Sequence, residues 1–102
     1  MNITDYEAEV ISSAVDYFIK HDVSGITTQR KSELNNSALE AISLINSHAD
    51  NIGIKHVQAV DSALVLYISF LKQSLLANPK ALSTAECLAD KFDAYLEPFL
   101  MD

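Results

Sequence analysis

The chain has 102 residues, enough for one folded domain with a core of its own and too few for two. Hydrophobic residues make up 49% of it and only two glycines and two prolines occur, a composition that argues against intrinsic disorder. The formal net charge of −7 disfavours binding to nucleic acid or to an anionic membrane surface, because both attract clustered lysine and arginine.

The termini and the cysteine content indicate a cytoplasmic protein. The longest apolar run, 63–68, is far shorter than the roughly 20 residues that a membrane span needs. Asp5, Glu7 and Glu9 stand where a signal peptide would carry lysine or arginine. Cys87 is alone and cannot form an intrachain disulfide, which fits a reducing compartment.

Two helices are expected in the first half of the chain. Thr4 and Glu7 have the spacing of a capping box, and apolar residues recur at helical spacing after them, so the first helix is predicted over about 5–22. One of the two threonines at 27–28 caps a second helix, predicted over about 28–50.

Two further helices are expected in the second half. The segment 54–77 contains no helix breaker and stops before Pro79, because the residue before a proline is disfavoured in the α region. Ser83 and Glu86 repeat the capping-box spacing and predict a fourth helix over about 84–97.

Four helices joined by short connections predict an all-α fold. Short loops favour antiparallel neighbours, so we expect residues 1–102 to form a single compact four-helix bundle in up-down-up-down order. The third helix is expected to be the longest and the most buried.

The third predicted helix carries two apolar stripes. The first falls within an arc of roughly 80–90° and has the character of a core face: Val57, Val60, Leu64, Tyr67, Ile68, Leu71 and Leu75. The second lies mostly opposite, where a bundle helix normally faces water: Ala59, Ala63, Leu66, Phe70 and Ala77. Either the other helices surround this helix and bury both stripes, or a patch around Leu66 and Phe70 is exposed and buries itself against another chain, most readily in a homodimer.

An acidic stripe is predicted on the fourth helix, opposite its apolar face. It falls within an arc of roughly 60° and contains Glu86, Asp90, Asp93 and Glu97. A solvated face that keeps the protein soluble is one interpretation. The other is a surface for a cationic partner, because like charges three and four residues apart repel and no lysine is interspersed to relieve them.

Nothing in the sequence has the spacing of a catalytic, metal or cofactor site. His21, His48 and His56 lack the pairing of a zinc site, and the two isolated glycines cannot form a phosphate-binding loop. Serines are plentiful, but none lies in a recognisable nucleophile elbow. We therefore predict a protein that is not an enzyme and has no metal or cofactor.

In size, charge and helix count the chain resembles bacterial immunity proteins and phage-encoded inhibitors, which neutralise a basic enzyme by docking on it. No motif carries this resemblance, so it assigns no residue. The leading hypothesis is a cytoplasmic protein-binding module, of bacterial or phage type, whose acidic stripe meets a basic partner and whose apolar patch on the third helix supports dimerisation. One alternative is a bundle that holds an apolar small molecule between its second, third and fourth helices, with Tyr67 or Tyr95 as the polar handle. The other is a structural homodimer within a larger assembly.

Overall fold

The computed structural model describes residues 3–21, 23, 25–48, 52–74 and 78–100, with the backbone alone at 99 and 100. These residues form four helices and no strand, so the all-α prediction is confirmed. The helices are α1 (Asp5–Lys20), α2 (Thr28–Asn46), α3 (Ile54–Gln73) and α4 (Pro79–Leu100).

The first two helices begin where side chains satisfy their free N-terminal amides. At α1 the Glu7 amide donates to Thr4 Oγ1 at 3.1 Å, and the Thr4 amide donates to Glu7 Oε1 at 2.9 Å. This is the predicted capping box. At α2 the hydroxyl of Thr27 accepts from the Arg30 amide at 3.0 Å. Gly25 lies between the two helices with φ +91°, a left-handed conformation that glycine adopts without steric cost.

The first three helices end earlier than their apolar patterns predicted. The predicted ends at 22, 50 and 77 lie outside the described residues, whereas the last helical residues are Lys20, Asn46 and Gln73. Ser74 follows α3 with an extended backbone. A hydrophobic pattern marks which residues are apolar, and it does not mark where the backbone leaves the helix.

The predicted start of the fourth helix is wrong, because α4 begins at Pro79. Asn78 caps it: its Oδ1 accepts from the Lys80 amide at 2.9 Å, and its carbonyl accepts from the Leu82 amide at 3.1 Å. Proline suits the first helical position, where its missing N–H leaves no bond unmade. Ser83 is therefore inside the helix. With 22 residues, α4 is longer than α3, which has 20, so the prediction that the third helix is the longest is also wrong.

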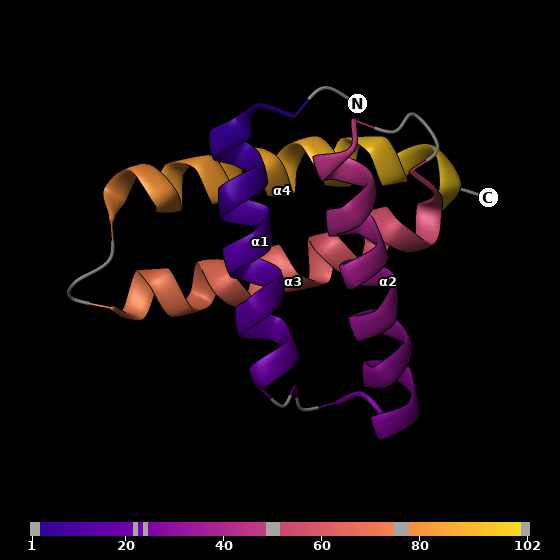
Figure 1. Ribbon diagram of the computed structural model, residues 1–102. Helices are drawn as coiled ribbons and strands as arrows, with labels where there is room; N and C mark the ends of the chain where they lie inside the picture. Colours follow the sequence, from indigo (N-terminus) through magenta and orange to yellow (C-terminus); the bar gives the residue numbers. More distant parts are fainter. Residues whose placement is uncertain (1–2, 22, 24, 49–51, 75–77, 101–102) are drawn as a thin grey trace.

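The helices form two antiparallel pairs, and one pair lies across the other (Figure 1). The α1–α2 pair runs across the α3–α4 pair, so the four helices do not alternate along one common axis as the up-down-up-down prediction requires. Among the described residues α2 and α4 do not meet, whereas α1 and α3 each pack against all three other helices. A short loop makes consecutive helices neighbours, but it leaves their crossing angle to side-chain packing.

The first apolar stripe of α3 supplies much of the core. Val57, Val60, Leu64 and Leu71 are buried, while Tyr67 and Ile68 are half-buried. Leu75 lies outside the described residues.

The second stripe of α3 divides into a buried and an exposed part. Ala59 and Ala63 are fully buried. They lie on the side of α3 that carries His56, which contacts α2, and Phe70, which contacts α1. Over the first half of α3, the monomer itself therefore buries the second stripe. Ala77, at the other end of the stripe, lies outside the described residues.

By length and composition alone, α3 is apolar enough to cross a membrane, although its longest uninterrupted apolar run, 63–68, is short. The core helix of a globular protein meets the same criterion. Here α3 packs against the three other helices in a globule with a radius of gyration of 13.1 Å, which is compatible with a soluble protein.

Ala63→Leu tests whether the second stripe is packed. The larger side chain has no room at a fully buried position, so we expect a loss of about 1–3 kcal/mol in the free energy of unfolding, measured by urea denaturation. Ser69→Leu, at an exposed position of the same helix, is the control and should change stability by less than about 0.5 kcal/mol. Equal effects of the two changes would contradict the packing described here.

Candidate functional site

The predicted acidic stripe lies on the outer side of α4. Glu86, Asp90, Asp93 and Glu97 are all exposed. A different side of the helix, centred roughly 115° from the stripe, is held in the core by Ala85, Leu88, Ala89, Phe92 and Leu96. Since the carboxylates follow one another at intervals of three or four residues, this burial directs all four toward solvent.

Few positive charges offset this stripe. Lys72 Nζ, on α3, lies 3.7 Å from Glu86 Oε2, and both side chains are about half exposed, so the pair contributes little. Lys91, although it is on α4, pairs instead with Glu7 of α1 at 3.3 Å. Among the described residues, no lysine or arginine pairs with Asp90, Asp93 or Glu97.

A fifth carboxyl group extends the stripe onto α3. Asp61 is half-buried, and its Oδ1 atom is buried without a hydrogen-bond partner. The carboxyl group of Asp93, on α4, lies close enough to perturb the carboxyl group of Asp61. Burial, and then the contact with Asp93, raise the pKa of Asp61 to about 7. Two carboxyl groups so close are most stable when they share one proton or when a cation joins them.

Asp61 was not predicted from the sequence, although one signal points to it. It is the only carboxylate of α3, and on a helical wheel it borders the core stripe on the side of Val57 and Ile68. A charged residue at the edge of a core face is either paired or perturbed. The sequence could not reveal that its neighbour would be a second aspartate.

An apolar hollow of about 330 Å³ lies beside Asp61, between α3 and the end of the α1–α2 pair. Its apolar lining consists of Phe18, Val23, Ile26, Leu34, Val65 and Leu66, with Asp61, Ser62 and Ser69 as the polar members. Neither Tyr67 nor Tyr95, the tyrosines expected to orient an apolar ligand, lines it. The hollow also involves α1, which the predicted ligand site between the last three helices did not include.

A second hollow, of about 300 Å³, lies between α3 and α4. The acidic stripe contributes Glu86 and Asp90 to its rim. Val65 and Ser69 line both hollows, so the two are contiguous. Val65 is 55% exposed, the most exposed of the large hydrophobic side chains in the described chain. We call the two hollows, with Val65 between them and Asp61 beside it, the α3 face.

The two residues of the predicted self-association patch lie in different surroundings. Leu66 is half-buried and lines the apolar hollow. Phe70 is 41% exposed and belongs to an aromatic cluster, with its ring centroid 4.6 Å from that of Tyr17 and 6.1 Å from that of Tyr67. The ring of His21 stacks on that of Tyr17, with 3.9 Å between the ring centroids.

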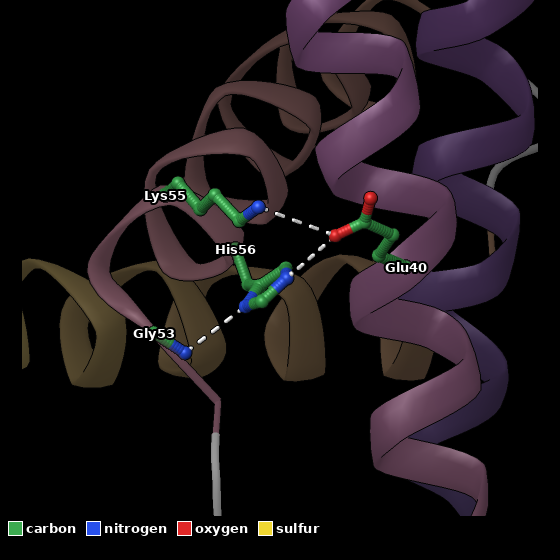
Figure 2. A network of polar contacts seen from close by, with 4 residues as sticks. All are labelled: Glu40, Gly53, Lys55 and His56. Carbon is green, nitrogen blue, oxygen red and sulfur yellow. Dashed lines mark hydrogen bonds and ion pairs between the residues drawn. The ribbon is translucent and has the colours of Figure 1, made fainter.

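His56 has a structural role at the start of α3 (Figure 2). The Gly53 amide donates to His56 Nδ1 at 3.0 Å, so Nε2 carries the proton and donates to Glu40 Oε2 at 3.0 Å. The hydrogen bond from His56, and then the charge of Lys55, lower the pKa of Glu40. Nδ1 is thus engaged at the start of α3 and Nε2 joins α3 to α2, which leaves neither ring nitrogen for a metal.

The described residues contain no group of three or more histidine, cysteine or carboxylate side chains that could hold a metal ion. No family model matches the chain, and neither does a curated protein or a solved structure. The arrangement of charge and apolar surface therefore carries the functional argument alone.

Asp61→Asn should stabilise the fold at alkaline pH. The pKa of Asp61 is about 7 in the folded chain, whereas its ordinary value is 3.8. Between these two pH values the folded chain therefore binds more protons than the unfolded chain. The stability that this proton supplies is complete below the ordinary value and is lost as the pH rises through about 7. The full difference corresponds to about 4 kcal/mol. After allowance for solvent screening at this half-buried site, we expect a gain of about 1–2 kcal/mol at about pH 8.5.

The measurement is urea denaturation of wild type and variant at about pH 4 and about pH 8.5, and the two proteins should agree at the lower pH. Asp90→Asn controls for the removal of one negative charge from the same acidic region. A gain from Asp61→Asn that is equal at both pH values would contradict the account of the carboxyl pair.

Proposed function

We propose that this protein is a non-enzymatic binding module that docks on a basic surface of another protein, in the manner of a small acidic inhibitor or immunity protein of bacterial or phage type. The acidic stripe, Glu86, Asp90, Asp93 and Glu97, is the surface that meets the partner. The proposal includes a cytoplasmic location and no role in binding nucleic acid or membranes, in keeping with the net charge of −7.

The contact between Asp61 and Asp93 is the observation that carries the proposal. Two carboxyl groups this close to each other destabilise the folded chain at neutral pH unless a proton or a cation joins them. No lysine or arginine of the described chain does so. Perturbed carboxyl groups of this kind are enriched at functional sites.

A guanidinium or ammonium group from a partner would relieve this repulsion on binding. It would convert an unfavourable contact in the free protein into charge-assisted hydrogen bonds in the complex. The exposed carboxylates of the stripe would also attract a basic partner over a distance of about one Debye length, which speeds encounter and makes it sensitive to salt.

Reversal of three charges tests the stripe. The variant Glu86→Lys, Asp90→Lys, Asp93→Lys should bind an isolated, purified partner at least about tenfold more weakly than wild type at low ionic strength, because three attractive charges become repulsive. The difference should shrink as salt is added. Isothermal titration calorimetry at several salt concentrations measures both effects.

The matched control reverses Glu9, Asp16 and Glu33, three exposed carboxylates on α1 and α2, and changes the net charge by the same amount. An equal loss of affinity in the control variant would assign the effect to net charge and contradict a role for the stripe.

We propose self-association through Leu66 and Phe70 as a second candidate function, in which the protein is a homodimer. The support is the 41% exposure of Phe70 within a cluster of four aromatic rings that includes Tyr17 and Tyr67. Aromatic side chains of this kind are enriched at interfaces.

Phe70→Glu separates this candidate from the first. Light scattering should give a dimer for wild type and a monomer for the variant, because the charge could not be buried at the interface. Leu39→Glu, at a position of α2 that is 53% exposed, is the control and should stay dimeric. A monomeric wild type would contradict the homodimer.

A further inference from the structure

The acidic and apolar parts of the α3 face adjoin each other. Val65 and Ser69 line both hollows, so no ridge of other residues separates them. Asp61 lines the apolar hollow and reaches Asp93 of the acidic stripe. A ligand that enters the apolar hollow therefore passes directly beside the carboxyl pair.

The two parts have opposite chemical demands. The apolar hollow presents Phe18, Ile26, Leu34 and Leu66, with Val65 at its edge, and a group that fills it must be apolar. The rim of the second hollow presents two carboxylates, Glu86 and Asp90, against one lysine, Lys72, and this excess of negative charge favours a cationic group there. The charge on this rim specifies the partner's chemistry.

We infer that the α3 face binds a basic amphipathic segment of a partner protein, which places an apolar side chain in the hollow between α3 and the α1–α2 pair and lysine or arginine side chains on Asp61, Asp90 and Asp93. The inference rests on the proposed function and names the kind of partner that the acidic stripe meets. An amphipathic helix with adjoining apolar and basic stripes has this chemistry.

The exposure of the apolar hollow to solvent suits a side chain of a partner better than a free small molecule. A volume of about 330 Å³ corresponds to roughly ten waters, which one or two large apolar side chains displace. Two of its lining residues, Val65 and Ile26, are 55% and 37% exposed, so the hollow is open to solvent. An open hollow cannot enclose most of the surface of a small ligand, as a typical ligand pocket does.

Charge also argues against a second copy of this chain as the occupant. The copy would bring a net charge of −7 to a rim that already carries Glu86, Asp90 and Asp93. Juxtaposed like charges oppose association.

The test uses the whole chain and a synthetic helical peptide of about 18 residues, five turns long, with a leucine stripe bordered by a lysine stripe. A scrambled peptide of the same composition is the peptide control. Binding is measured by isothermal titration calorimetry, and amide chemical shifts in NMR spectra identify the residues affected.

Val65→Gln is the informative variant, because an exposed position tolerates the change and the new side chain is neutral. We expect it to weaken peptide binding about fivefold to tenfold, since it removes apolar contact from the hollow's edge. Leu39→Gln, at a position of α2 that is 53% exposed and lies outside the α3 face, should bind within about twofold of wild type. The largest shifts should fall on residues 61–69.

Three results would overturn the inference. One is wild-type protein that binds the patterned peptide no better than the scrambled peptide. A second is equal affinity in wild type and Val65→Gln while Glu86→Lys, Asp90→Lys, Asp93→Lys still weakens binding, which would retain the acidic surface of the proposed function and reject the hollow. The third is a wild-type dimer in light scattering that the peptide dissociates, which would assign the α3 face to a second copy.

Discussion

The burial of α3 on two sides is the interaction on which the rest of this fold depends. The side with Leu64 and Leu71 supplies the core, and the side with Ala59 and Ala63 is closed by the crossing α1–α2 pair. Because alanine is small, the helices can approach closely along that side. Because α3 packs on two sides, it sets the orientation of the α1–α2 pair relative to the α3–α4 pair. This explains why the two pairs cross instead of lying along one axis.

This packing also determines what α3 leaves exposed. The crossing pair covers its first half, whereas Val65, Ser69 and Phe70 in the second half are exposed. Asp61 is at the border of the covered region, where α4 brings Asp93 against it. The surface that we propose for a partner is thus a consequence of the fold. The monomer leaves an apolar edge open next to Asp90 and Asp93, with which no lysine or arginine of the described chain pairs.

Local signals in the sequence predicted local features well. The capping box at Thr4 and the apolar periodicity gave the helices and the acidic stripe, because each depends on residues three or four apart. The prediction of a cap at Ser83 was wrong because a stronger signal, Asn78 followed by Pro79, starts the helix about five residues earlier. The crossing of the pairs and the contact between Asp61 and Asp93 depend on residues distant in sequence, which periodicity cannot bring together.

Hydrogen exchange at the amides of α3 tests the central claim, that the monomer itself buries both stripes. In a sample dilute enough for light scattering to give a monomer, the amides of residues 59–64 should exchange only through global unfolding, with opening free energies within about 1 kcal/mol of the free energy of unfolding. Their protection should not change with protein concentration. Protection that appears only in concentrated samples would show that another chain covers the second stripe, and would contradict this account.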